Sequence, residues 1–170
     1  MNVALDISVP SGLWRGLPRA RALARETIAA AIEEIGMAGR EGVEVSLCLG
    51  DDAQLRRLNL RWRGLDKPTN VLSFPAAAVD AVADRVGRAQ RARKQLGDVA
   101  LAYETLAREA SELGVPLADH YRHLVAHGFL HLLGYDHETA SEAERMEALE
   151  SRIMARLGAA DPYPREVADG

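Results

Sequence analysis

The sequence predicts a single α+β domain in which a small mixed four-stranded sheet packs with about five helices. Strand-like segments dominate the first part of the chain and helical segments dominate after residue 102. A chain of 170 residues, of which 48% are hydrophobic, is long enough to bury one sizeable core. No internal repeat or linker-like stretch divides the chain, so we expect one domain over residues 1–170.

The first part of the chain alternates between strands and helices. An alternating segment before Pro10 is typical of a strand, and a segment rich in Ala, Arg and Glu then shows helical spacing. A second apolar strand leads into a helix that Asp51 or Asp52 would cap and Gly64 would end. Pro75 closes a third, short strand. The expected elements are therefore Val3–Val9, Pro18–Met37, Val43–Leu49, Asp52–Gly64 and Val71–Phe74.

The second part is mainly helical. Residues 76–96 form a variable basic connection that could be a loop or an exposed helix. A fourth strand and three helices follow, and residues 158–170, which contain two prolines, are expected to be an irregular tail. The expected elements are Asp98–Leu101, Tyr103–Leu113, Leu117–Leu133 and Ser141–Leu157.

Composition limits the classes of function. The net charge of −4 alone argues against a nucleic-acid partner, yet Arg and Lys residues gather in 54–67 and 76–96. Such a local basic surface is compatible with phosphate binding, although a solvated helix face is the simpler alternative. The start of the chain does not resemble a signal peptide and no apolar run is long enough for a membrane span, so we expect a soluble cytoplasmic protein. Cys48 is the only cysteine, so a metal would need nitrogen and oxygen ligands.

The spacing of three histidines predicts a metal site. His127 and His131 are four residues apart on a predicted helix and present their imidazoles to one side. Gly134 allows the chain to leave the helix at positive φ, after which His137 can complete a three-nitrogen site. Three protein nitrogens and an open fourth position are what catalytic zinc requires. His120 and His123 lie on the same face, where solvated histidines or partners of the ligand histidines are expected rather than a second metal site.

The same spacing matches the zinc-protease pattern H-E-x-x-H-x-x-G-x-x-H, so the helix is expected to be zincin-like. One position differs: the protease general base would be a glutamate where this chain has Gly128. The pattern therefore keeps the metal ligands and loses the peptidase base.

At this point the chain closely resembles the YbeY family, bacterial endoribonucleases that act in ribosomal RNA maturation. The resemblance rests on the histidine segment 127–137 and on the block 63–75, with sequence RGLDKPTNVLSFP. The segments 96–99 and 146–150 are also similar to the family, so the likeness covers most of residues 43–163. The longer, more basic stretch 76–96 departs from it.

The resemblance implies site residues and partners. His127, His131 and His137 would hold one Zn²⁺, and Arg63 falls on the family's functional arginine, which would contact the RNA phosphate. Asp98 and Asp136 are candidates for orienting a ligand histidine, with strand or turn roles as the alternatives. For RNA backbone contacts, Arg61 and Lys67 are weaker candidates. The implied partners are ribosomal or other single-stranded RNA and ribosome-associated proteins.

Three hypotheses for function follow. The first is a single-strand-specific metallo-endoribonuclease acting at the 3′ end of small-subunit ribosomal RNA and in ribosome quality control, in which zinc activates water or polarises the phosphodiester. The second is an RNA-binding ribosome assembly factor with a structural metal, which an open coordination position disfavours. The third is a metallopeptidase-like hydrolase, which Gly128 disfavours.

Overall fold

The computed structural model describes residues 3–37, 42–76 and 94–164. Its elements, in chain order, are β1 (Val3–Ser8), a short 3₁₀ helix (Gly12–Gly16), α1 (Ala20–Glu34), β2 (Val43–Gly50), α2 (Asp52–Arg63), β3 (Val71–Pro75), β4 (Lys94–Ala102), α4 (Tyr103–Leu113), α5 (Leu117–Leu132) and α6 (Ala140–Arg156).

The sheet is mixed, with the strand order β1-β2-β4-β3. β2 pairs in parallel with β1 and with β4, whereas β3 pairs antiparallel with β4 and forms one edge of the sheet. The predicted α+β class, with a mixed four-stranded sheet and about five helices, is confirmed.

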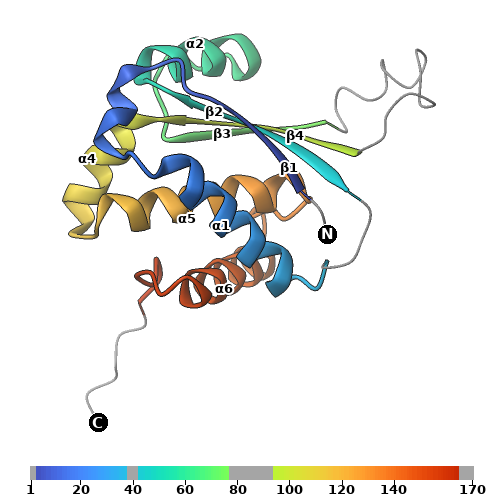
Figure 1. The fold of residues 1–170 in the computed structure, drawn as a ribbon. Coiled ribbons are helices and arrows are strands. Elements are labelled where there is room, and N and C mark those ends of the chain that lie inside the picture. Colours follow the sequence, from blue (N-terminus) through green and yellow to red (C-terminus); the bar gives the residue numbers. More distant parts are fainter. Residues whose placement is uncertain (1–2, 38–41, 77–93, 165–170) are drawn as a thin grey trace, which may run out of the picture.

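The helices are divided unequally between the two faces of the sheet. α2 lies on one face, while α1, α4, α5 and α6 lie on the other (Figure 1). Alternate residues of β2, among them Val45 and Leu47, are buried in the main core on the side of the four helices. A smaller apolar cluster under α2 contains Leu55 and Leu72. The face with four helices therefore holds most of the core, and the α2 face is only partly covered.

Local signals set the helix ends that matter for the site. The Asp51 side chain accepts a hydrogen bond from the amide of Gln54 and so caps α2, which ends at Gly64 with φ 70°. α6 begins with a reciprocal capping box between Thr139 and Glu142. These ends fix the last turn of α2 and the start of α6.

The structure departs from the sequence prediction in two places. β4 begins at Lys94 rather than Asp98. Its first residues are separated from the predicted part by a bulge opposite Glu44 and Val45, where Gly97 adopts a φ of 140°. The residues before the bulge are polar, so the apolar pattern of the sequence did not predict this part of the strand. The short 3₁₀ helix that buries Trp14 was not predicted.

Two other predicted segments are only partly described. The basic connection 76–96 lies mostly outside the described residues, as does the last part of the 158–170 tail. The described part of that tail, up to residue 164, contains neither helix nor strand. Among the helices of the described ranges, none has both the length and the apolar character needed to cross a membrane.

Candidate metal centre

Three histidine side chains converge at the C-terminal end of α5. His127 and His131 lie one turn apart, and their Nε2 atoms are 3.1 Å apart. The chain leaves the helix at Gly134, with φ 97°, and the following turn brings His137 back beside them. One ring nitrogen from each histidine lies within 4.8 Å of the others. The structure therefore brings together the three histidines that the spacing selected.

The donor set fits a zinc ion. Zinc–nitrogen bonds of about 2.0–2.1 Å in a tetrahedron place two ligand nitrogens about 3.3 Å apart. The separation of 3.1 Å between the Nε2 atoms of His127 and His131 is close to that value. The third donor, a ring nitrogen of the exposed His137, lies within 4.8 Å of the ring nitrogens of the other two histidines.

The histidines line an open pocket of about 770 Å³. One wall is β3, which is the sheet edge, and another is the turn after α5. The last turn of α2 adds Trp62 and Arg63, so the predicted phosphate-binding arginine lies in the same pocket as the histidines. A polymer chain can reach this pocket from solvent, which a closed structural metal site would not allow.

Arg61 and Lys67, the weaker RNA-contact candidates, lie outside this pocket lining. The guanidinium carbon of Arg61 is 5.3 Å from the centre of the Trp62 ring. Lys67 is exposed, and its backbone carbonyl accepts a hydrogen bond from the side chain of the buried Asn59, 2.9 Å away. The structure therefore does not bring either residue into the lining of the histidine pocket.

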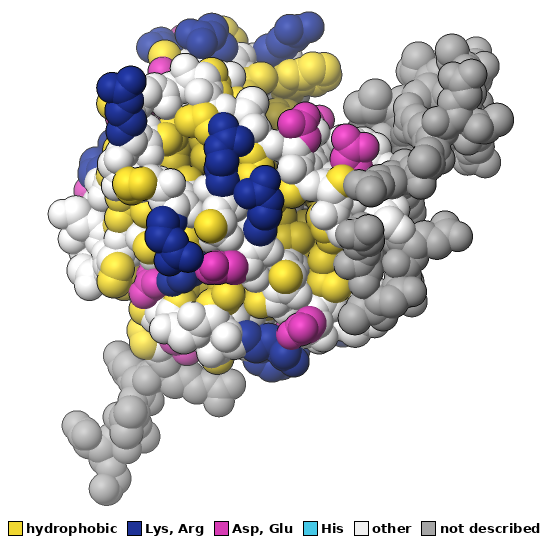
Figure 2. Space-filling model, in the orientation of Figure 1, with side chains coloured by type: hydrophobic (Ala, Val, Ile, Leu, Met, Phe, Trp, Pro, Cys, Tyr) yellow, Lys and Arg dark blue, Asp and Glu magenta, His cyan; other side chains and the backbone are white. Residues whose placement is uncertain are grey.

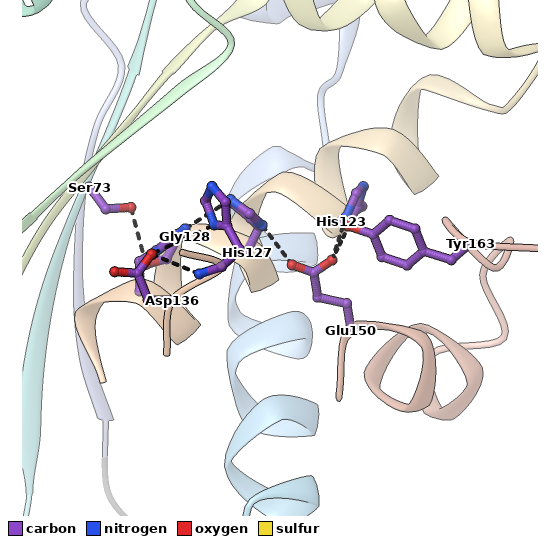
Figure 3. A network of polar contacts seen from close by, with 9 residues as sticks. Ser73, His123, His127, Gly128, Asp136, Glu150 and Tyr163 are labelled. Carbon is purple, nitrogen blue, oxygen red and sulfur yellow. Dashed lines mark hydrogen bonds and ion pairs between the residues drawn. The ribbon is translucent and has the colours of Figure 1, made fainter. Parts of the chain in front are cut away.

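Glu150 of α6 belongs to the candidate site and was not predicted from the sequence. Its side chain lies between two histidines of α5 and a tyrosine of the C-terminal segment (Figure 3). One carboxylate oxygen is 2.6 Å from Nδ1 of His127. The other is 2.9 Å from Nε2 of His123 and accepts a hydrogen bond of 2.6 Å from the Tyr163 hydroxyl. Glu150 therefore connects a predicted ligand histidine to the body of the protein.

This contact selects the tautomer that a metal ligand needs. Burial alone would raise the pKa of Glu150, but hydrogen bonds from His123 and His127 lower it to about 2, so the carboxylate is ionised. An ionised carboxylate only accepts, so Nδ1 of His127 carries the proton and Nε2 keeps its lone pair for a metal. Desolvation lowers the pKa of His131, and the neighbouring histidines add to that effect, which also favours the neutral ligand form.

A second group of potential ligand atoms consists of His123, His127 and Glu150. Its atoms already satisfy one another through short hydrogen bonds, and Glu150 is fully buried. This group therefore supports the first cluster through hydrogen bonds and leaves the open pocket to the three histidines. His120 instead contacts Glu109, with 3.1 Å between His120 Nε2 and a carboxylate oxygen.

Gly128, the position where a zinc protease has its general base, faces the sheet. A Cβ atom at this position would lie 2.7 Å from Cγ1 of Val99 and 3.2 Å from the hydroxyl oxygen of Ser73. The Ser73 hydroxyl donates a hydrogen bond to the Gly128 carbonyl, as Figure 3 shows. Close packing of α5 on β3 and β4 thus requires glycine here, and the space that a catalytic glutamate would need is filled.

The two aspartates proposed as histidine partners lie in different places. Asp136 accepts a hydrogen bond from the backbone amide of His137 at 2.7 Å, while its oxygen is 3.8 Å from Nδ1 of that ring. Asp136 therefore shapes the turn that presents His137. Asp98 stands opposite Phe74 in the β3–β4 pairing and lines a separate cavity on the α2 side of the sheet. The structure does not bring Asp98 into the histidine pocket.

The sequence of α6 contains a pattern from which a buried role for Glu150 could have been predicted. Met146, Leu149 and Ile153 follow helical spacing and are all buried, and Glu150 is the one acidic residue among them on that face. A carboxylate inside an apolar stripe needs a buried donor. The histidine-rich helix is the natural source of such donors.

Comparison with known proteins identifies the family of the chain. The family model described as "Endoribonuclease YbeY" matches residues 16–158. Proteins named Endoribonuclease YbeY from Methylocella silvestris and Rhodopseudomonas palustris are 45% and 48% identical to this chain, covering 99% and 94% of it and 90% of each relative. The solution structure of TM1509 from Thermotoga maritima shares the fold, with a TM-score of 0.54 and 22% identity over 95% of this chain and 100% of that protein. The chain therefore belongs to the YbeY endoribonuclease family.

Proposed function

We propose that this chain is a zinc-dependent endoribonuclease that cuts single-stranded RNA in the maturation of ribosomal RNA, at the 3′ end of the small-subunit RNA, and in ribosome quality control. It would act in the cytoplasm and would associate with proteins of the ribosome. The names of the relatives support RNA as the substrate. The observation that carries the proposal is the convergence of three histidine nitrogens in an open pocket that also contains Arg63.

Different side chains would bind the metal, bind the phosphate and orient the metal ligands. When bound, the zinc ion supplies a Lewis acid that polarises a phosphodiester or activates a water molecule. Three neutral imidazoles leave the positive charge of the ion uncompensated, which favours an anionic substrate. Arg63 can hold two phosphate oxygens through its planar guanidinium and stabilise the negative charge that develops on them.

The fixed position of His127 is a further contribution of the protein. The Glu150 carboxylate holds Nδ1 of His127, and the Tyr163 hydroxyl and His123 hold the carboxylate in turn. Burial raises the pKa of Tyr163, and its hydrogen bond to Glu150 raises it further, so the phenol keeps its proton and remains a donor. Because this network already orients His127, little conformational freedom of that ligand is lost when the metal binds.

The test combines metal analysis with RNA cleavage. Purified protein is expected to contain about one zinc per chain and to cleave a single-stranded RNA, with activity lost on chelation and restored by zinc. His131→Ala is expected to lose both zinc and cleavage. Arg63→Gln is expected to keep zinc and lose about 10²-fold or more in the cleavage rate. Arg57→Gln, an exposed arginine of the same helix outside the pocket lining, is the matched control and should behave as wild type.

Thermal unfolding of each variant separates catalysis from folding. A folded His131→Ala variant that has lost zinc but still cleaves RNA would show that the metal is not catalytic. Loss of zinc together with loss of the folded state would instead favour the assembly-factor hypothesis with a structural metal.

A further inference from the structure

Trp62 is an unusually exposed aromatic side chain beside the histidine pocket. It lies in the last turn of α2, directly before Arg63, and 61% of its surface is accessible. Tryptophan is largely buried in most folded proteins, because its indole ring has a large apolar surface. The position of Trp62 therefore calls for a reason beyond folding.

A second cavity adjoins the first at this residue. It has a volume of about 480 Å³ and lies on the α2 side of the sheet. The two cavities share four lining residues, namely Trp62, Ser73, Phe74 and Pro75. Because β3 is an edge strand, a chain that leaves the histidine pocket can pass around this edge and reach the second cavity. Trp62 stands at the crossing point.

The surroundings of Trp62 suit a nucleobase. Phe74 supports the indole from the sheet, with ring centres 6.1 Å apart and a tilt of 54°. The guanidinium of Arg61 lies 5.3 Å from the indole centre. Arg61 lies over the indole and Arg63 follows Trp62 in the pocket lining, so positive charge stands beside an exposed aromatic ring, a combination that binds the phosphates and stacks the bases of single-stranded nucleic acid. Figure 2 shows dark blue Lys and Arg side chains along the edge of the molecule over α2.

The lining of the second cavity favours a base over a phosphate. Asp6 and Asp98 contribute carboxylates and Ser46 contributes a hydroxyl, beside apolar walls that include Leu58. Carboxylates repel phosphate but accept hydrogen bonds from the amino groups of bases. The apolar walls can cover the flat face of a ring.

We propose that Trp62 is a stacking site for an unpaired nucleobase of the RNA strand whose phosphate lies in the histidine pocket, and that the strand continues toward the second cavity. This inference rests on the proposed function for the nature of the strand. It would give the proposed preference for single strands a structural basis, because the bases of a duplex are already stacked and their faces are not available to Trp62. The flanking arginines and the shared walls favour RNA here over a protein partner.

The test measures binding without cleavage. A labelled single-stranded RNA with 2′-O-methyl riboses, which resists cleavage, is titrated with protein in the presence of a chelator. Trp62→Ala and Trp62→Leu are expected to raise Kd by about 5- to 150-fold, the range for loss of one base–aromatic stack. Trp62→Phe keeps an aromatic face and is expected to stay within about threefold of wild type. Leu60→Ala, which shortens another exposed apolar side chain of the same helix, should leave Kd unchanged.

Tryptophan fluorescence gives a second, direct readout. The only other tryptophan, Trp14, is 3% exposed and its indole N–H donates to the Gly50 carbonyl, so quenching by added RNA reports on Trp62. Quenching by the single strand but not by a duplex of the same sequence is expected. The proposal is overturned if quenching is absent, if Trp62→Leu binds as well as Trp62→Phe, or if Trp62→Ala binds the single strand with wild-type affinity, as a protein-binding role for Trp62 would give.

The outcome is separable from that of the proposed function, because the titration contains no metal. Binding that depends on Trp62 in a protein that never cleaves RNA would leave this inference standing and refute the proposed activity. If the protein cleaves RNA with zinc but its Kd for RNA does not depend on Trp62, the proposed activity stands and this inference is refuted.

Discussion

Replacing Glu150 by glutamine tests how the metal centre is held in place. The substitution keeps the shape of a fully buried side chain and removes its charge. The carboxylate accepts on both sides, from His127 on one and from His123 and Tyr163 on the other. A glutamine has one accepting oxygen and one donating nitrogen, so one side must lose its hydrogen bonds.

Either orientation of the amide has a measurable cost. If the amide nitrogen faces His127, it favours the tautomer with the proton on Nε2, which blocks the ligand atom. If it faces Tyr163 and His123, the phenol and the imidazole can no longer donate to an accepting oxygen there and must rearrange in a buried space. We expect zinc affinity to fall by about 10- to 100-fold, equivalent to about 1.4–2.7 kcal/mol. The metal-free protein should lose about 1.5–3 kcal/mol of unfolding free energy, the range for a hydrogen bond to a charged group.

The assay is a competition titration against a coloured zinc chelator at neutral pH, with urea unfolding of the metal-free protein measured separately. Glu144→Gln is the matched control, because Glu144 is an exposed glutamate of the same helix. A Glu150→Gln variant with wild-type zinc affinity would refute the orientation argument. So would an equal loss in Glu144→Gln, which would point to general charge instead of a specific contact.

Three further outcomes are expected. Gly128→Ala should cost about 1–3 kcal/mol in urea unfolding, because its Cβ would lie 2.7 Å from the buried Val99 side chain, and a loss below about 0.5 kcal/mol would contradict this packing. The hydrogen bond from Arg156 lowers the pKa of Glu34, so its contribution to stability is present above the unfolded pKa near 4.5 and is lost as the pH falls through the lowered pKa. Glu34→Gln should therefore cost about 0.5–1 kcal/mol at neutral pH, since Arg156 is partly exposed, with the gap to wild type closing in acid across a pH series of urea titrations. Asp98→Asn should leave zinc affinity in the chelator competition within about twofold of wild type, and a tenfold loss would show that Asp98 acts on the metal centre after all.

The parts of the site that depend on neighbours in sequence were predictable. Helical spacing places His127 and His131 on one face, and Gly134 supplies the turn that returns His137. These three positions depend on a single helix and its exit, so local rules are sufficient. The same reasoning found most helices and strands, since their apolar periodicity is strong.

Contacts between distant segments were not predictable in this way. Glu150 meets His127 only because α6 packs against α5, and the spacing within either helix does not reveal that pairing. Asp98 is the opposite case, because its place beside the family motif makes it a candidate partner for a histidine, whereas in the structure it lines the cavity on the α2 side. Strand alternation places Val99 on the α5 side and therefore Asp98 on the α2 side, but the sequence does not say which side carries the histidine helix.

The late position of α6 in the chain has a consequence for biosynthesis. A ribosome releases residues 127–137 well before Glu150, and Tyr163 comes later still. Until α6 has emerged and docked, His127 lacks the carboxylate that sets its proton, so the proposed metal site would be incomplete in a shorter nascent chain. The proposed metal centre therefore depends on α6 as much as on the helix that carries its histidines.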